Sequence, residues 1–322
     1  MPVIRKGDVV IAPLELTGLT KVFPTPSGPF IAVKDVNAQV HEGEFIAILG
    51  HSGCGKSTVL SMIAGLETAT FGGVVIDGRE VIGPGEERAI VFQSPCLLPW
   101  LTARQNVALA RAQMKGRKAA ASRASADTFL EMVGVADAGS QLPAHLSLGT
   151  QQCVSLARAL STEPRFLLLD EPFSMLDSLT RFELQDTLLR VWEESAFAKA
   201  TADRSAAAKA TADRSAAATA TPDTSETADA PADTSATTIV MVTHDVDEAL
   251  YLADRLVLMT DGPEATVGDV LTVPFARPRE RSSVLAHPDY HRCRRHVIDF
   301  LEHHAHQSRA SPLDSVLHKR RA

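Results

Sequence analysis

Short runs of apolar residues recur along the chain and alternate with stretches of helical periodicity. Four runs have the length and the Val, Ile, Leu and Phe content of buried strands, and they span residues 45–49, 89–92, 166–169 and 239–242. Apolar residues at helical spacing recur over residues 181–192, 246–252 and 291–304. Because buried parallel strands show continuous apolar runs, this order predicts an α/β fold in which helices flank a mostly parallel sheet.

The pattern changes between the second and third apolar runs, where the chain shows no convincing strand. Residues 97–160 carry Arg- and Ala-rich amphipathic segments, which predict a helical subdomain inserted into the sheet domain. We therefore expect four parts: a sheet core with an antiparallel β-structure in its N-terminal region, a helical subdomain, an insert and a short helical extension. We expect the core to span 14–94 and 161–272, the helical subdomain 95–160, the insert 196–237 and the extension 273–322.

A different kind of sequence precedes the fourth apolar run. The ten residues AKATADRSAA at 198–207 are repeated at 208–217, and a tract of Ala, Thr, Asp, Ser and Pro follows. Of the 42 residues at 196–237, 17 are alanine and the one other apolar residue is Phe197. Alanine buries little area, so this segment cannot offset the entropy lost on ordering and is predicted to be a disordered insert. A transient Ala-rich helix over the two repeats is the alternative.

Composition and charge narrow the class of protein. The 322 residues hold 32 Lys and Arg against 39 Asp and Glu, a net charge of −7, which argues against a general nucleic-acid-binding surface. No stretch approaches the ~18 consecutive apolar residues of a membrane-spanning helix, and the first residues lack the features of a signal peptide, so we expect the chain to stay in the cytoplasm. Four scattered cysteines without a CxxC pair indicate reduced thiols: Cys54, Cys96, Cys153 and Cys293.

The strongest chemical signal lies directly after the first apolar run and before the helix-like sequence TVLSMIAGL. A G-x-x-x-x-G-K-[ST] pattern between a strand and a helix predicts a phosphate-binding loop. Its glycines let backbone N–H groups curl around phosphate oxygens, its lysine neutralises the β- and γ-phosphates, and its serine can ligate Mg²⁺. We expect Cys54 to contribute its backbone, and alkylation of its thiol to block nucleotide binding. The loop is formed by Gly50, His51, Ser52, Gly53, Cys54, Gly55, Lys56, Ser57 and Thr58.

Paired carboxylates follow the third apolar run. Asp170 ends the predicted strand and Glu171 comes next. Given a phosphate-binding loop upstream, Asp170 is expected to hold Mg²⁺ through water. Glu171 is expected to orient or deprotonate an attacking water, an assistance worth about 10²–10⁴-fold in rate.

Three further segments complete an ordered set: Gln93 after the strand at 89–92, Ser174-Met175-Leu176-Asp177, and Val242-Thr243-His244-Asp245 at the end of the fourth run. The set resembles the ATP-binding cassette family, the nucleotide-binding subunits of ABC transporters, over residues 14–195 and 238–285. The resemblance implies a RecA-like P-loop NTPase fold with ATP and Mg²⁺ as ligands.

The same resemblance implies a role for each segment. Gln93 would couple the γ-phosphate and Mg²⁺ to a membrane partner, Asp177 would signal across a cassette dimer, and His244 would contact the γ-phosphate. The Mg²⁺ ligands would be Ser57, Gln93 and Asp170. An aromatic ring before the phosphate loop would stack on adenine. We expect this ring to be Phe23, with Phe30 as the alternative, and a purely structural role remains open for either phenylalanine.

The family's signature usually reads LSGGQ with a basic residue three positions later, whereas this chain reads LSLGTQQC at 146–153. Ser147 and Gly149, which in the family touch the partner's γ-phosphate, are present. Leu148 replaces a glycine, and such a side chain can hinder close approach and backbone freedom; Thr150 replaces a glutamine and Cys153 an arginine. We hypothesise a low ATP turnover for a homodimer, and pairing with a non-identical cassette.

A transport function requires separate membrane subunits, because the chain lacks an expected spanning segment. The apolar stretch CLLPWL at 96–101 is a candidate docking patch for these permease subunits, or else it packs the helical subdomain. Four segments carry a closer resemblance: KVFPTPSGPF at 21–30, GHSGCGKST at 50–58, FQSPCLLPWLTARQNVALA at 92–110 and PFARPRER at 274–281. They resemble the cassettes of nitrate/nitrite importers and of related sulfonate and taurine importers. This resemblance implies a peripheral position at the cytoplasmic face of the membrane and indirect work with a substrate-binding protein. A soluble ABC-type ATPase acting on DNA or ribosomes, and a nucleotide kinase, are the alternatives.

Overall fold

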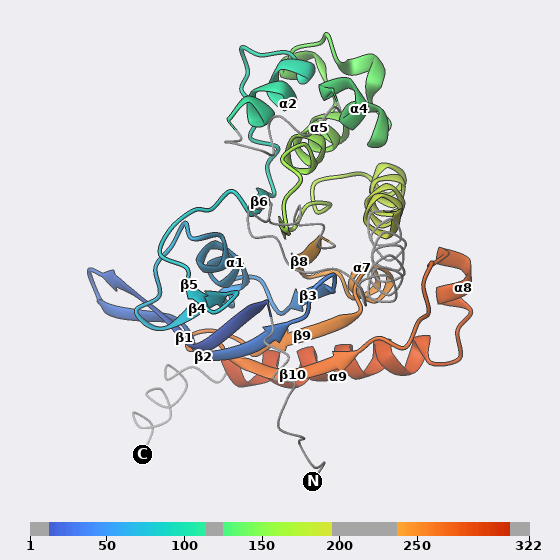
Figure 1. The fold of residues 1–322 in the computed structure, drawn as a ribbon. Coiled ribbons are helices and arrows are strands. Elements are labelled where there is room, and N and C mark those ends of the chain that lie inside the picture. The colour runs from blue at the N-terminus through green and yellow to red at the C-terminus, as the bar shows by residue number, and fades with distance from the viewer. Residues whose placement is uncertain (1–12, 114–124, 195–236, 310–322) are drawn as a thin grey trace, which may run out of the picture.

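Two sheets form the body of the protein in the computed structural model, which describes residues 13–113, 125–194 and 237–309 (Figure 1). The larger sheet has the strand order β10-β9-β3-β8-β7-β6 and is parallel except for its edge strand β10, which pairs antiparallel with β9. The predicted mostly parallel sheet is therefore confirmed. In chain order its strands are β3 (Phe45–Leu49), β6 (Arg88–Val91), β7 (Phe166–Asp170), β8 (Thr238–Thr243), β9 (Arg255–Met259) and β10 (Val267–Thr272).

The central strands are buried on both faces, as their continuous apolar sequences predict. Every residue of β3 and of β8 is buried. Because successive side chains of a strand point to opposite faces, Phe45, Ala47 and Leu49 join one hydrophobic cluster and Ile46 and Ile48 join a second. The sheet thus separates two cores, one under the helices and one under the second sheet.

The second sheet is antiparallel, with the strand order β2-β1-β4-β5. The predicted antiparallel part of the N-terminal region is therefore confirmed. This sheet contributes to the hydrophobic core that contains Ile46 and Ile48. Helix α1 (Lys56–Ala64) contributes to the same core. The strands are β1 (Leu14–Thr25), β2 (Gly28–Val40), β4 (Phe71–Ile76) and β5 (Arg79–Glu80).

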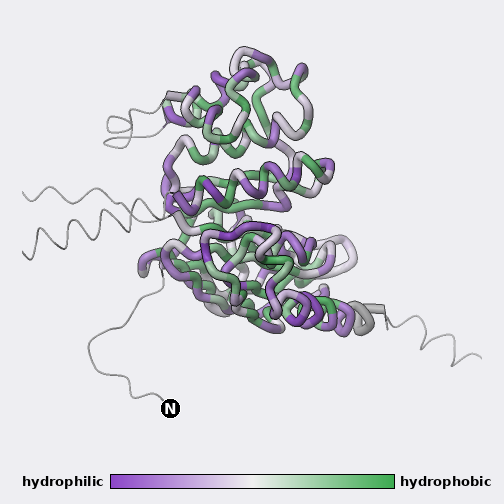
Figure 2. Tube along the Cα trace, turned by 90° about the vertical axis from the view of Figure 1, so that its right-hand side faces the viewer, coloured by the Kyte–Doolittle hydropathy of each residue, from purple (hydrophilic) through white to green (hydrophobic). Residues whose placement is uncertain are grey.

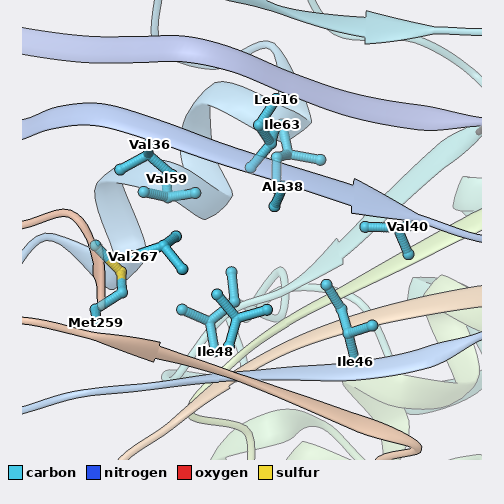
Figure 3. A pocket seen from close by; sticks show the side chains of 11 residues that line it. Leu16, Val36, Ala38, Val40, Ile46, Ile48, Val59, Ile63, Met259 and Val267 are labelled. Carbon is cyan, nitrogen blue, oxygen red and sulfur yellow. The ribbon is translucent and has the colours of Figure 1, made fainter. Parts of the chain in front are cut away.

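A small cavity of about 10 Å³ lies between the two sheets and α1 (Figure 3). The side chains around it are all apolar and come from β1, β2, β3, α1, β9 and β10, with Leu16, Ile48 and Met259 among them. A buried water needs two to four polar partners, which this lining does not offer. The interface between the sheets is therefore purely hydrophobic at this point.

The inserted helical subdomain lies above the sheets at the top of both views (Figure 1, Figure 2), and its core residues share one hydrophobic cluster with Phe45 and Leu49 of β3. At the start of α2, the Thr102 side chain accepts from the Gln105 backbone N–H and the Gln105 side chain accepts from the Thr102 N–H, a capping box that fixes the entry of the chain into the subdomain. The subdomain contains α2 (Ala103–Ala112), α4 (Ala126–Met132), the 3₁₀ turns Ala136–Ala138 and Pro143–His145, and α5 (Leu148–Leu160).

The remaining helices lie around the larger sheet. A helix covers residues 178–194, α7 spans Val246–Leu252 as predicted, and α8 (Arg281–Leu285) leads to α9. Helix α9 (Tyr290–Arg309) runs beneath β9 and β10 in Figure 1 and is longer than the predicted 291–304. Among the helices that the structure describes, none has the length and apolar character needed to cross a membrane.

The predicted disordered insert lies outside the described residues, apart from Thr237. The residues on either side of it meet in the structure: Trp192 Nε1 donates to the Thr237 carbonyl at 2.7 Å, and Thr237 Oγ1 donates to the Pro164 carbonyl at 3.1 Å. The Trp192 ring also packs edge-to-face on Phe45 of β3, with ring centroids 5.6 Å apart. The end of the helix over residues 178–194 and the start of β8 are thus joined by side chains as well as by the chain itself.

Candidate active site

The phosphate-loop sequence forms a tight loop between β3 and α1, and Lys56 holds it together from inside. The Lys56 ammonium donates to the carbonyl oxygens of Gly50 and His51, both at 2.8 Å, and this residue is only 4% exposed. A buried ammonium requires such partners. The two carbonyls therefore point inward, and helix α1 begins at Lys56, two residues earlier than the sequence pattern suggested.

Two glycines of the loop adopt backbone conformations that other residues rarely take. Gly53 has φ +82° and Gly55 has φ +95°. At Gly55 an added Cβ would also lie 2.5 Å from Cγ1 of Val33, a residue of β2. These positions let the loop curl closely against β2, while Ser52 and Gly53 face the exterior. This shape fits a phosphate group held by backbone N–H groups.

Cys54 points in the opposite direction, into the core below the loop. It is 1% exposed, and burial raises the pKa of its thiol. Its sulfur packs under the loop, and its backbone N–H donates to the His51 carbonyl at 3.3 Å. The alkylation experiment suggested by the sequence is a poor probe, because a reagent reaches the exposed Cys96 far more readily than the buried, protonated Cys54.

His51 has a partner that the sequence did not reveal. Its Nδ1 lies 2.8 Å from Oδ1 of Asp261, in the loop between β9 and β10. Gly262 of the same loop approaches the phosphate loop, because a Cβ added there would lie 3.5 Å from the Gly53 carbonyl oxygen. The turn sequence Thr260-Asp261-Gly262-Pro263 after an apolar run was the available signal for this support.

The carboxylate pair stands beside this loop at the end of β7. Ser57 Oγ donates to Oδ1 of Asp170 at 2.8 Å, so the two proposed Mg²⁺ ligands are adjacent. Burial raises the pKa of Asp170 and the neighbouring Glu171 charge acts in the same direction, whereas the Ser57 hydrogen bond opposes the shift. Paired hydroxyl and carboxylate oxygens are the ligand types that Mg²⁺ prefers. The residues present therefore fit the ion.

Glu171 and His244 meet because β7 and β8 are neighbouring parallel strands. Asp170 pairs in register with Val242, and the Glu171 N–H donates to the Val242 carbonyl at 2.9 Å. His244 Nδ1 lies 3.2 Å from Glu171 Oε2. Glu171 has φ +44°, in the left-handed region. This turn ends the strand and directs the chain away from the sheet.

Gln93 and Asp177 lie in the loops around this pair. Gln93 Nε2 donates to Ser174 Oγ at 3.2 Å, and Ser174 Oγ donates to the Glu171 carbonyl at 3.0 Å, which links Gln93 to Glu171 through one side chain. Asp177 accepts from the backbone N–H groups of Leu179 and Thr180, both at 3.1 Å, and so caps the helix over residues 178–194. The linking role of Ser174 was not predicted from the sequence.

The altered signature forms the first turn of α5. Ser147 caps this helix: its Oγ accepts from the Thr150 N–H at 3.1 Å and lies 2.9 Å from the Thr150 hydroxyl. Leu148 starts the helix and is 39% exposed, and it is not among the positive-φ residues. The expectation that a glycine's backbone freedom is needed here is therefore wrong for this chain, because a helical first turn suits any side chain. What Leu148 adds is an apolar group on the surface.

Gly149 and Cys153, two further positions of the signature, differ in burial. Gly149 is buried, and a Cβ there would lie 2.6 Å from Cγ2 of Thr180. Cys153 is half-buried, and burial raises the pKa of its thiol to about 11, so it presents no charge where the family has a basic residue. The signature turn thus packs tightly against the helix that follows Asp177.

The structure places the two candidate aromatic residues opposite each other in the β1–β2 hairpin. Phe23 pairs with Phe30 in the strand register. Phe30 is 45% exposed, whereas Phe23 is half-buried with the Lys21 ammonium 5.1 Å from its ring centre. Both rings belong to the same end of the sheet, and the choice of Phe23 for adenine stays a prediction.

The candidate docking patch is held by side-chain hydrogen bonds and carries one exposed ring. Asn106 fixes the loop, since its side chain accepts from the Leu98 N–H at 2.8 Å and donates to the carbonyls of Leu98 and Leu101. Arg158 donates to the Cys96 carbonyl at 2.8 Å. Trp100 is 70% exposed on this loop. An apolar ring held outward on a braced loop is a suitable contact for another protein.

The site has the parts of a P-loop ATPase. Lys56 is buried in a loop between a strand and a helix, Ser57 bonds to Asp170, and Glu171 contacts His244 across the ends of β7 and β8. The helical subdomain inserted between β6 and β7 identifies this ATPase as an ATP-binding cassette.

The comparisons with known proteins give the same class. The family model described as ABC transporter matches residues 33–174. The nitrate import ATP-binding protein NrtD of Synechococcus elongatus is 44% identical over 282 residues, which cover 87% of this chain and 88% of NrtD. The bicarbonate transport ATP-binding protein CmpD of Synechocystis sp. is 40% identical over 94% of this chain and 93% of its own length.

A solved structure shows the same fold. The dimeric post-hydrolysis state of the ATP-binding cassette MJ0796 bound to ADP and Pi superimposes with a TM-score of 0.59 at 26% identity, over 82% of this chain and all of that one. The chain belongs to the ABC transporter family. It is an ATP-binding subunit, an ATPase coupled to transport, and cassettes of this family dimerise and work with membrane permease subunits.

Proposed function

We propose that this chain hydrolyses Mg-ATP to drive uptake of a small oxyanion, nitrate, through separate permease subunits. The observation that carries the catalytic part is the contact of 3.2 Å between Glu171 Oε2 and His244 Nδ1 at neighbouring strand ends. The 44% identity to NrtD, a nitrate import protein, supports the substrate. Bicarbonate is the competing oxyanion, because CmpD is similar over a comparable length.

Each residue of the site receives a role in this proposal. The phosphate loop from Gly50 to Gly55 binds the phosphates through its backbone, and Lys56 and Thr58 follow at the start of α1. Ser57, Gln93 and Asp170 would hold Mg²⁺, Asp170 through water. The ion, when bound, offsets the negative charge of the phosphate oxygens. Phe23 stacks on adenine.

Hydrolysis requires one proton acceptor and one in-line water. The water oxygen forms a bond to the γ-phosphorus as the bond to the β,γ-bridging oxygen breaks, and ADP leaves. Glu171 accepts the proton of the attacking water, an assistance of about 10²–10⁴-fold. His244 holds the Glu171 carboxylate and contacts the γ-phosphate. Both residues lie on strand ends or adjoining turns, which keeps their separation fixed.

Dimerisation and docking complete the proposal. Ser147 and Gly149 of one cassette would contact the nucleotide of the other, and Asp177 would carry the signal across the dimer. Trp100 would contact a permease, holding the chain at the cytoplasmic face of the membrane, with a substrate-binding protein delivering the anion. The exposed Leu148 favours a non-identical partner whose own signature serves this chain's nucleotide.

Uptake in the source organism tests the substrate. A strain that lacks this chain should lose uptake of isotope-labelled nitrate, and the wild-type chain should restore it while Glu171→Gln should not. As a matched control, Glu163→Gln changes an exposed glutamate that also has positive φ, and should restore uptake fully. Loss of bicarbonate uptake with normal nitrate uptake would assign the chain to the other oxyanion and reject nitrate.

A further inference from the structure

Helix α7 begins two residues after His244, with Asp245 as its N-cap, and is only seven residues long. Helices this short are marginal on their own, so tertiary contacts must hold α7 in place. Within the described residues, the one polar partner of the His244 ring is Glu171, and the side chain of His244 is 53% exposed. The position of the imidazole is therefore set by its backbone, at the junction of β8 and α7.

Two arginines from the sequence PFARPRER hold the C-terminal end of α7. Arg277 Nη2 donates to the Leu252 carbonyl at 2.6 Å, and Arg279 Nη1 donates to the carbonyls of Tyr251 and Ala253 at 3.0 and 2.8 Å. The side chain of Arg279 is only 1% exposed. Cations at the last carbonyls of a helix satisfy unpaired acceptors and offset the helix dipole. These arginines act as the C-terminal cap of α7.

Helix α9 holds the other end. Asp247, three positions after His244, accepts from the Tyr290 hydroxyl and from Arg294 Nε, both at 2.7 Å to Oδ1, and Arg294 Nη2 lies 3.4 Å from Oδ2. Burial acts against the charged form, yet the hydrogen bonds from Arg294 and Tyr290 prevail and lower the pKa of Asp247. The carboxylate is therefore ionised at neutral pH and firmly bound to α9.

We propose that four side chains of the C-terminal segment, Arg277, Arg279, Tyr290 and Arg294, form a clamp on α7 that positions His244 beside Glu171. The clamp fixes α7 at both ends, so the short helix can neither slide along its axis nor tilt away from β8. The four residues act through His244 and are positioning residues for ATP hydrolysis. The inference rests on the proposed role of His244.

Loss of Arg294 should disturb the reaction more than nucleotide binding. The phosphate loop follows β3, whereas the carboxylate of Asp247 is bonded to Tyr290 and Arg294 of α9, so the KM for ATP should stay unchanged in Arg294→Ala. Because a misplacement of about 1 Å can cost as much as 10²-fold, kcat should fall about tenfold. Tyr290→Phe removes one hydroxyl and keeps the ring, so it should lower kcat by a smaller factor. Arg294→Lys should restore part of the rate.

The decisive test combines these variants with His244→Ala in the complete importer, purified through a tag on the full chain. If the clamp acts through His244, Arg294→Ala should lower kcat in the wild type and have no further effect in His244→Ala. Arg292→Ala is the matched control: it lies on the same helix, pairs with Asp289 and has a side chain 75% exposed, so its kcat should be unchanged.

The outcomes separate this inference from the proposed function. A full kcat in His244→Ala would reject the role of His244 itself. A reduced kcat in His244→Ala with an equal loss from Arg294→Ala in both backgrounds would reject the clamp alone, as would a rise in KM without a change in kcat. If Arg294→Ala lowers the melting temperature so far that it cannot be assayed, the milder Tyr290→Phe gives the same comparison.

Discussion

Glu171→Gln isolates the chemistry of one carboxylate with almost no change in shape. Glutamine has the same length, and it adopts the observed φ of +44° as readily as glutamate does. The Glu171 N–H bond to the Val242 carbonyl is a backbone contact and remains. The variant loses the proton-accepting oxygen and the charge that faces His244 at 3.2 Å. We therefore expect a folded protein that binds ATP normally.

The size of the effect follows from the role. General-base assistance of about 10²–10⁴-fold corresponds to about 3–5 kcal/mol of activation free energy, which Glu171→Gln should remove. The stability change should be much smaller, because a contact with the half-exposed side chain of His244 contributes about 1 kcal/mol or less. Turnover should fall by at least a hundredfold while the free energy of unfolding stays nearly constant.

Two measurements on one sample check this prediction. Fluorescent-nucleotide binding should give equal affinities for wild type and Glu171→Gln, and phosphate release should show the loss of turnover. Glu163→Gln serves as the control on the protein surface and should behave as wild type in both. Turnover of Glu171→Gln within threefold of wild type would remove Glu171 from its role, whatever the binding result.

Three further predictions follow from the signature, the core and a buried carboxyl. Leu148→Gly removes an exposed apolar side chain and should raise the ATP turnover of the homodimer. The hypothesis of a non-identical partner is contradicted if the wild-type homodimer hydrolyses ATP cooperatively at a rate typical of the family and Leu148→Gly leaves that rate unchanged. Ile48→Ala enlarges the cavity of Figure 3 and should lower the free energy of unfolding in urea by about 2–5 kcal/mol, whereas Ile82→Ala at an 87% exposed site should stay within about 0.5 kcal/mol. Burial raises the pKa of Glu248 from 4.5 to about 7, so the folded state keeps a proton that the unfolded chain releases. Stability should therefore fall as pH rises through this window, by up to about 3 kcal/mol, and Glu248→Gln should flatten that part of the urea-unfolding profile; an unaltered slope would contradict this.

Four strands with an undivided apolar sequence were predictable, whereas β9 and the alternating edge strand β10 were missed. The runs at β3, β6, β7 and β8 were found within one residue at each end, and the polar residues at their ends located the site. Strand β9 was missed because it follows α7 after only two residues. Strand β10 was missed because, at the antiparallel edge, its residues alternate between half-buried and exposed.

Contacts between distant segments could not be predicted from local patterns. The sequence showed PFARPRER as a motif, yet nothing in it pointed to the partners of its arginines. Arg277 and Arg279 donate to backbone carbonyls of residues 251–253, which have no side-chain signature, and both also contact the Asp254 carboxylate. The same holds for Asp261 beside His51 and for Ser174 beside Gln93. Such pairs depend on the order of strands in the sheet, which a single chain's periodicity does not define.

The bond between Trp192 and Thr237 makes the site of the insert a convenient position for engineering. The two residues are hydrogen-bonded to each other, and each doubling of the length of a loop between two such fixed points costs about 0.6 kcal/mol in closure entropy. A fluorescent protein placed within residues 195–236, or a direct short link in their place, should therefore leave ATP turnover intact. The cassette thus offers an internal attachment point that spares both chain ends.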